Sequence, residues 1–244
     1  MKVRVIGSGS RGNATIVETA SCNILIDAGL TYKNISERLG GDVPNIDIVV
    51  ITHTHKDHIG GLKSVLKKDP IVYTMADLGN LVSYDKINNE RQFSIGDTSL
   101  KLFDLSHDSY CCGMIISDGD KELVYITDTG YINKKYFDIL SNRNVYVMES
   151  NHDIEMLNNG SYPFNLRQRI LSDKGHLSNY DSAKYLSSFI GNNTKCIILA
   201  HLSEDNNTEE LAYNTLIERL NDSDTHVDNI IIAKQNKETE LVKL

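Results

Sequence analysis

The sequence contains no tryptophan and only three prolines, and its four cysteines form no C-x-x-C pair. Cys111 and Cys112 are adjacent within an apolar run, so the pattern indicates core thiols in a reducing compartment and no disulfide framework. Internal repeats, low-complexity segments and a proline-rich linker are also absent from the sequence. We therefore expect one continuous domain over residues 1–244.

Long apolar runs and excess positive charge are missing as well. No stretch reaches the roughly 18 residues of a membrane span, and the opening MKVRVIGSGS is too polar for a signal peptide, which predicts a cytoplasmic protein without membrane contact. Lys and Arg total 25 against 33 Asp and Glu, a net charge of −8. That balance argues against non-specific coating of nucleic acid but allows a nuclease with a small cationic pocket.

A chain of 244 residues buries enough apolar surface to fold without structural metal, so a metal site would be functional. Short β-branched segments with Gly or Ser between them dominate the first third, and helical segments alternate with strands in the second half. This order predicts an α/β fold in which two β-sheets pack on each other and helices flank them. The expected strands are Val3–Ile6, Ala14–Glu18, Asn23–Ile26, Ile46–Thr52, Ile71–Thr74, Gln92–Ile95, Leu100–Leu105, Met114–Ser117, Leu123–Thr127, Val145–Met148, Cys196–Leu199 and Ile230–Ala233. The expected helices are Asn34–Leu39, Gly61–Lys68, Lys134–Leu140, Leu166–Leu171, Ser178–Phe189 and Glu209–Leu220.

Three histidines and an aspartate stand within six positions directly after the buried strand Ile46–Thr52. In an extended segment His53 and His55 point the same way, and the following turn presents Asp57 and His58 to a second point a few ångströms away. This spacing divides four ligands between two neighbouring cations. The alternative is a polar surface loop that happens to hold three histidines.

Further ligands are expected where other apolar strands end, because a strand end holds a side chain rigidly. His107, Asp128 and His201 occupy such positions. We predict that His53, His55, His107 and Asp128 bind one metal, and that Asp57, His58, Asp128 and His201 bind the other. Asp27, which follows Asn23–Ile26, is expected to accept a hydrogen bond that orients the ligand loop.

Two divalent ions and these carboxylates would leave the pocket positively charged, which suits a phosphodiester and a metal-bridging hydroxide as nucleophile. His176 stands before a helix and can contact a phosphate or protonate a leaving alkoxide, or it can be an exposed histidine at a helix entry. Arg167, Arg169 and Lys174 precede it, either as a solvated helix face or as a track for a nucleic-acid backbone.

The ordered set of Asp27, His53-x-His55-x-Asp57-His58, His107, Asp128 and His201 resembles the motifs of the metallo-β-lactamase superfamily. The Gly7–Asn13 opening, the Thr127–Tyr131 segment, the Glu149–Asp153 segment and the Gly175–Asn179 segment resemble its YycJ (WalJ)-like subfamily, related to ribonucleases J and Z. The resemblance implies an αββα four-layer sandwich of two mixed β-sheets and a 5′→3′ DNA exonuclease. It also implies that His176 contacts the scissile phosphate or assists the leaving group, with catalytic roles for Asp57 and His176.

Further expectations concern a possible inserted domain, the metals and the residues around the ligands. Only short elements separate Asp128 from His201, so no β-CASP insertion is expected. The metals are Zn²⁺ or Mn²⁺, with Fe²⁺ as a further possibility. Glu149 is expected beside the ligands as a supporting acceptor, and His152 contributes to substrate binding, metal binding or a structural hydrogen bond. The substrate-binding candidates are Ser8, Ser10, Asn13, His152 and Ser203, with Asn206 and Asn207 as further candidates for a terminal phosphate.

DNA is the favoured substrate and RNA the next. The same ligands also serve hydrolases of lactones, thioesters and β-lactams, so that activity is the main alternative. A binding module that keeps the fold without turnover is a third, and a purified protein without metal would favour it.

Overall fold

The computed structural model describes residues 1–80, 83–86 and 92–244. The chain divides into two compact units, each assembled from separate stretches of sequence. Unit 1 contains residues 1–104, 109–121 and 233–244, and unit 2 contains residues 105–108 and 122–232. The prediction of one domain over the whole chain stays a prediction. Within the described residues the strands form two sheets of seven.

One whole sheet belongs to unit 1, in the order β14-β1-β2-β3-β4-β5-β6. β1 pairs antiparallel with β14 and β2, and β2 pairs antiparallel with β3. β3, β4, β5 and β6 then run parallel. The strands are β1 (Lys2–Gly7), β2 (Ala14–Glu18), β3 (Asn23–Ile26), β4 (Ile48–Ile51), β5 (Ile71–Thr74), β6 (Asp85–Lys86) and β14 (Val242–Lys243). Because β4 is parallel and buried along its whole length, it reads IVVI without alternation.

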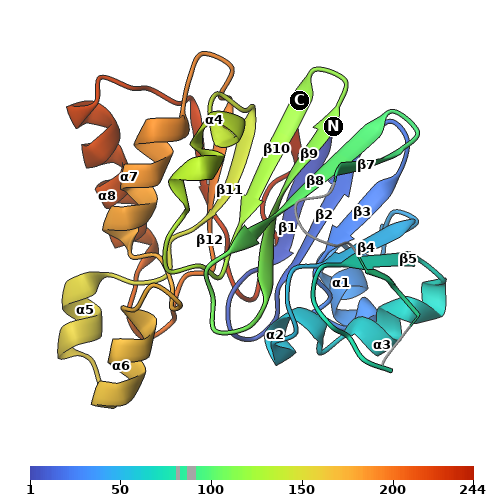
Figure 1. Cartoon of the computed structure of the whole chain (residues 1–244), viewed down its shortest axis with the longest axis horizontal. Coiled ribbons are helices and arrows are strands. Elements are labelled where there is room, and N and C mark those ends of the chain that lie inside the picture. The colour runs from blue at the N-terminus through green and yellow to red at the C-terminus, as the bar shows by residue number, and fades with distance from the viewer. Residues whose placement is uncertain (81–82, 87–91) are drawn as a thin grey trace. The chain divides into compact units, whose positions relative to one another are not determined.

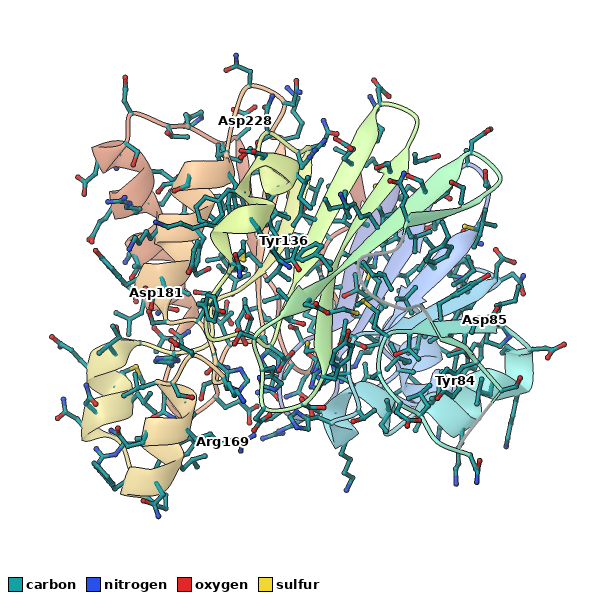
Figure 2. All side chains as sticks on the ribbon, in the orientation of Figure 1. Tyr84, Asp85, Tyr136, Arg169, Asp181 and Asp228 are labelled. Carbon is teal, nitrogen blue, oxygen red and sulfur yellow. The ribbon has the colours of Figure 1, made fainter. Side chains whose placement is uncertain are left out.

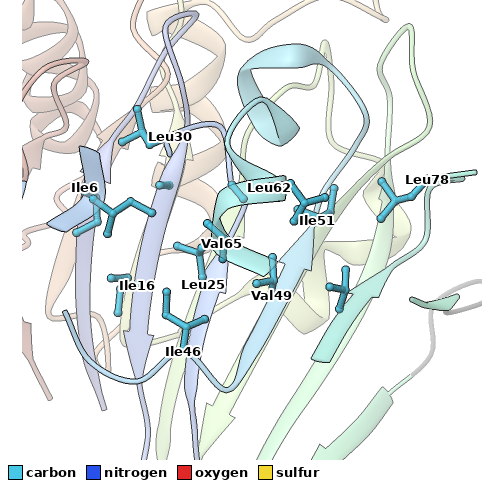
Figure 3. Packing of buried hydrophobic residues seen from close by; sticks show 14 residues of the cluster. Ile6, Ile16, Leu25, Leu30, Ile46, Val49, Ile51, Leu62, Val65 and Leu78 are labelled. Atoms are coloured by element: carbon cyan, nitrogen blue, oxygen red, sulfur yellow. The ribbon is translucent and has the colours of Figure 1, made fainter. Parts of the chain in front are cut away.

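Short helices of unit 1 pack on this sheet through an aliphatic cluster that includes Ile35. Figure 3 labels Val49, Leu62 and Val65 of the same cluster. Thr31 caps the first helix by accepting a hydrogen bond from the backbone N–H of Asn34. The helices are α1 (Tyr32–Arg38), α2 (Lys56–Ile59), α3 (Leu62–Val65) and the 3₁₀ turn η1 (Leu66–Lys68). Unit 1 also contains β7 (Gln92–Ile95), nearly all of β8 (Thr98–Leu105) and β9 (Cys111–Asp118), and β7 pairs antiparallel with β8.

Unit 2 is built on four parallel strands in the order β13-β12-β11-β10 (Figure 1). They are β10 (Lys121–Ile126), β11 (Val145–Glu149), β12 (Cys196–Ala200) and β13 (Asn229–Ile232). Its helices are η2 (Lys134–Tyr136), α4 (Phe137–Leu140), α5 (Ile154–Asn159), α6 (Phe164–Ile170), α7 (Asn179–Phe189) and α8 (Glu209–Asp222). Parallel strands end at the same edge, so residues that follow β10, β11 and β12 meet there.

The predicted strands and helices are all present, most with ends shifted by one or two residues. The pattern missed four short elements, α2, α5, β6 and β14. β6 and β14 have two residues each and α2 has four, which is too few to show a hydrophobic period, and α5 has six. All four cysteines are buried and none forms a disulfide, which confirms the prediction of core thiols. Among the described residues no helix has the length and hydropathy of a membrane span.

Candidate metal centre

The histidine-rich loop of unit 1 follows β4 and turns into α2. His53 and His58 are completely buried, and His55 is half-buried at the N-terminal end of α2. Nε2 of His53 lies 2.9 Å from Nδ1 of His55, as expected for two imidazoles on the same side of an extended segment. The His53 and His58 ring centroids are 4.0 Å apart. Three imidazoles therefore converge within one short loop.

Asp27 orients two of these rings from behind. Its Oδ2 lies 2.7 Å from Nδ1 of His58, and its carboxylate accepts hydrogen bonds from the backbone N–H and hydroxyl of Thr52. Because the Thr52 hydroxyl donates to Asp27, its oxygen, 3.1 Å from Nδ1 of His53, accepts a hydrogen bond from that ring. Both imidazoles are thus held with Nδ1 protonated, which leaves Nε2 as the nitrogen that can bind a metal. This tautomer presents Nε2 to a metal, and a carboxylate behind a ligating histidine is the usual way to fix it.

Unit 2 supplies the second group of polar side chains, at the carboxyl edge of its parallel strands. Asp128 follows β10, Glu149 ends β11, and His201 follows β12. Nε2 of His201 lies 3.5 Å from Oδ1 of Asp128, and Nδ1 of His176 lies 3.8 Å from the same oxygen. Each of Asp128, Glu149, His176 and His201 offers a ligand atom, and these four atoms lie within 4.8 Å of one another.

Glu149 connects two of these histidines through one oxygen. Oε1 lies 2.8 Å from Nδ1 of His176 and 2.9 Å from Nδ1 of His201. Oε2 accepts hydrogen bonds from the backbone N–H groups of Thr129 and Leu177. Burial opposes ionisation of this carboxyl, but the charge of His176 and hydrogen bonds from both histidines lower its pKa to about 2. Glu149 is therefore a carboxylate at neutral pH, so both Nδ1 atoms donate to it and both Nε2 atoms face away from it.

His107 lies in the same unit, where β8 ends. Its Nδ1 is 3.2 Å from the carbonyl oxygen of Gly175, and its Nε2 is 3.3 Å from Oδ1 of Asp108. Burial lowers the pKa of this imidazole. Asp108 also pairs with Arg169, which Figure 2 labels and which belongs to α6. At least one of the three cations before His176 therefore supports the His107 loop.

Three of the predicted functional residues, one in unit 1 and two in unit 2, have left-handed backbone conformations, with φ of 58° at Asp27, 60° at Asp128 and 59° at His201. Each follows a strand, so the chain turns sharply where the strand ends. Non-glycine residues rarely adopt this conformation, and it concentrates where function requires it. At each of these positions the sharp turn directs a polar side chain at the edge of its sheet.

The donor set of each unit fits a divalent cation. Imidazole nitrogens and carboxylate oxygens converge, and hydrogen bonds fix the histidine tautomers from behind. Such ligands suit Zn²⁺, Mn²⁺ and Fe²⁺ alike. The seven-ligand assignment and its division between two ions stay predictions.

The substrate-binding candidates differ in exposure. Ser10 is exposed and Ser203 is half-buried, whereas Ser8, Asn13 and His152 are buried. Among the described residues no atom forms a hydrogen bond with either ring nitrogen of His152, and burial lowers its pKa to about 4. Their roles in substrate binding stay predictions.

Two comparisons of sequence agree with this geometry. A family model described as a β-lactamase superfamily domain matches residues 22–197. The exodeoxyribonuclease WalJ of Streptococcus pneumoniae is 36% identical over 247 residues, covering 93% of this chain and 90% of WalJ. The exodeoxyribonuclease YycJ of Bacillus anthracis is 36% identical over 223 residues, covering 85% and 84%.

This chain belongs to the metallo-β-lactamase superfamily, in the family of WalJ and YycJ. The predicted family is therefore confirmed. Solved structures agree on the fold: the metallo-β-lactamase fold protein YhfI of Bacillus subtilis has a TM-score of 0.74 at 18% identity, covering 98% of this chain and 99% of YhfI. The short form of human tRNase Z has a TM-score of 0.66 at 14% identity, covering 98% and 99%. The predicted class, two mixed sheets flanked by helices, is confirmed as well.

Sequence reasoning missed two contacts that shape the centre. Thr52 belongs to no recognisable motif, yet its hydroxyl hydrogen-bonds to both Asp27 and His53 and so connects the carboxylate to that ring. The sequence suggests Asn13 only as a substrate-binding candidate, although its side chain contacts His58 and Asp57. Glu149 does have a signal in the sequence, because a carboxylate at the end of a buried apolar strand lies at the edge of the sheet where ligands collect.

Proposed function

We propose that this protein is a metal-dependent phosphodiesterase that removes nucleotides from the 5′ end of DNA. The observation that carries the proposal is the pair formed by Glu149 and His176 beside Asp128 and His201. It places an oriented imidazole next to predicted metal ligands. The exodeoxyribonuclease names of WalJ and YycJ, each 36% identical to this chain, support DNA as the substrate.

Divalent ions are proposed at the ligands His53, His55, Asp57, His58, His107, Asp128 and His201, as Zn²⁺, Mn²⁺ or Fe²⁺. When bound, such ions make a water nucleophile available near neutral pH and neutralise charge on phosphoryl oxygens. The protein contributes rigid ligands at strand ends and carboxylates that fix histidine tautomers. Loss of the rigid ligands or of these carboxylates would place the reacting groups less precisely and so lower the rate.

His176 is proposed as the proton donor. Its side chain is 18% exposed, so the ring is accessible, and its Nδ1 is 2.8 Å from Oε1 of Glu149. The ring therefore directs Nε2 away from Glu149. A water oxygen would bond to phosphorus as the P–O3′ bond breaks, so that the downstream nucleotide keeps a 5′-phosphate and the released nucleotide leaves with an O3′ alkoxide. The proton on Nε2 of His176 would neutralise that alkoxide. The Glu149 carboxylate stabilises the imidazolium before transfer.

End selection needs a contact for the terminal 5′-phosphate. Of the candidates, Asn206 and Asn207 are buried, and Asn207 hydrogen-bonds to the backbone of Ser150 and Asn151. Ser10 and Ser203 are more exposed and are the better candidates. With a net charge of −8, the protein should make few phosphate contacts, so the salt dependence of binding should be shallow. A cytoplasmic location stays a prediction.

The test compares one labelled DNA as a linear duplex with a free 5′ end and as a closed circle, each with Zn²⁺, Mn²⁺ or Fe²⁺. We expect metal-dependent release of nucleotides from the linear form, 5′-phosphate on the shortened strand, and no cutting of the circle. RNA of the same sequence measures the preference for DNA. Equal cutting of both DNA forms would indicate an endonuclease. Inertness to both, together with rapid lactone or thioester hydrolysis, would favour the alternative hydrolase.

A further inference from the structure

Asn13 lies in the loop between β1 and β2, and the residue is 1% exposed. Its Nδ2 lies 2.9 Å from Nε2 of His58 and 3.2 Å from Oδ2 of Asp57. Those two atoms are themselves 3.4 Å apart. The amide nitrogen thus contacts, at the same time, the two atoms that the predicted site would offer to a cation.

The orientation of the amide is fixed by Gly9. The Gly9 N–H donates to Oδ1 of Asn13 at 2.7 Å, and Nδ2 of Asn13 donates to the Gly9 carbonyl at 3.2 Å. If the amide were flipped, Nδ2 would face the Gly9 N–H, donor against donor, and Oδ1 would face the Gly9 carbonyl, acceptor against acceptor. Oδ1 would also face the Asp57 carboxylate, which repels it. The observed orientation is therefore the one that the chemistry allows.

The backbone holds Asn13 in the same place. Its N–H donates to the carbonyl of Asp57 at 2.8 Å, and its carbonyl accepts from the N–H of Gly29 at 2.9 Å. A Cβ on Gly29 would come within 1.7 Å of the Asp57 carbonyl oxygen, so only glycine permits this approach. The β1–β2 loop is therefore attached to the ligand loop through backbone and side chain together.

His58 is constrained from both sides by these contacts. Asp27 accepts the proton on Nδ1, and the Asn13 amide donates to the lone pair on Nε2. A proton on Nε2 would face the amide N–H, so Asn13 favours the neutral tautomer that coordinates through Nε2. The amide has two hydrogens and three acceptors, namely the Gly9 carbonyl, Asp57 and His58. If a cation takes Nε2 of His58, both hydrogens still have acceptors.

We propose that Asn13 is a positioning residue that keeps His58 and Asp57 together, in the correct tautomer, ready to bind metal. Ligands that are ordered before binding lose less conformational entropy, so the amide raises the affinity of the Asp57–His58 site. The inference rests on the proposed metal binding by these two residues. It assigns Asn13 to metal loading instead of to substrate.

The test measures zinc binding by competition with a chromophoric chelator in the full chain, and follows thermal unfolding of the metal-free protein. Asn13→Ala should weaken one of the bound zinc equivalents by about 10–100-fold, the usual effect of removing a partner of a ligating residue. Thr239→Ala is the matched control, because it removes a different buried hydrogen bond in unit 1, from the Val5 N–H at 3.1 Å. It should lower stability while zinc affinity stays within about twofold.

Asn13→Asp separates two effects of the side chain: its donation to Asp57 and His58, and its hydrogen bond to Gly9, which holds the loop together. Aspartate keeps the size of the side chain and can still accept from Gly9, but it cannot donate to Asp57 or His58. Its charge beside Asp57 should lower the stability of the metal-free protein, and a cation should relieve that repulsion. We therefore expect Asn13→Asp to bind zinc at least as tightly as Asn13→Ala, with greater stabilisation by zinc than the wild type shows.

The two hypotheses fail in different ways. If the wild type binds no zinc, manganese or iron, the proposed metal site is wrong. If the wild type binds zinc and Asn13→Ala matches it within about twofold, the metal site stands and the role of Asn13 is wrong. Equal losses of affinity in Asn13→Ala, Asn13→Asp and Thr239→Ala would also overturn that role, because they would reflect general loosening of the unit.

Discussion

Oε1 of Glu149 and Nδ1 of His176 are separated by 2.8 Å, and the same oxygen lies 2.9 Å from Nδ1 of His201. One buried carboxylate therefore positions a proposed proton donor and a predicted metal ligand together. The two histidines nevertheless have different proposed tasks, so variants of this cluster should separate metal binding from proton transfer.

His176→Ala should keep near-normal metal content and lose about 10²-fold or more in turnover, because a positioned acid–base group contributes on that scale. Asp128→Ala should lose both metal and activity, since its carboxylate is predicted to serve two ions. Elemental analysis and single-turnover cleavage of 5′-labelled DNA measure the two effects. If His176→Ala loses metal first, the histidine is a ligand and the assignment must be exchanged.

Glu149→Gln should affect both functions. A neutral amide cannot accept from His176, His201 and two backbone N–H groups at once, so at least one buried donor loses its acceptor, at a cost of about 1–3 kcal/mol each. We expect about 10–100-fold weaker metal binding together with lower turnover at saturating metal.

Glu122→Gln is the matched control for Glu149→Gln, because Glu122 pairs with Arg143 elsewhere in unit 2. It should leave metal affinity unchanged. A Glu149→Gln variant with normal affinity and normal turnover would show that the hydrogen bonds to His176 and His201 have no functional role.

Asp27→Asn tests the support behind His58 and His53. Asparagine at this position can accept fewer hydrogen bonds, so the Nδ1 proton of His58 and the N–H and hydroxyl of Thr52 compete for one oxygen. We expect a loss of about 10–100-fold in metal affinity. Histidine ¹⁵N spectra of the metal-free protein should show a mixture of tautomers in the variant. A single tautomer and unchanged affinity would contradict this account.

The ligands and most of the elements could be predicted from the sequence because both leave local signals. A buried strand such as β4 is a continuous apolar run, and a polar residue directly after it stands at the edge of the sheet. His53, Asp128 and His201 were identified in this way. Glu149, the last residue of β11, follows the same rule.

The remaining features depend on contacts that the local sequence does not encode. Asn13 and His58 are 45 positions apart, and no pattern near either residue predicts their hydrogen bond. The left-handed conformations of Asp27, Asp128 and His201 are likewise not predictable, because none of these positions is a glycine, the residue that usually indicates such a conformation. The helix α5 does have a local signal, since Asp153 caps it by accepting a hydrogen bond from the Met156 N–H.

His152 predicts how stability depends on pH. Burial lowers its pKa from 6.5 to about 4 in the folded protein, so between these values the unfolded chain binds more protons than the folded one. Stability therefore rises with pH in this window, and acidification from pH 7 to 4 should destabilise the protein through His152 by up to about 3 kcal/mol. The ionised Glu149 contributes in a lower window, below its ordinary pKa of 4.5. Urea unfolding of metal-free protein at pH 7, 6 and 5 should show this loss, and His152→Gln, which cannot titrate, should show a shallower one. A variant with the same pH slope as the wild type would mean that His152 is protonated in the folded protein as readily as in the unfolded chain.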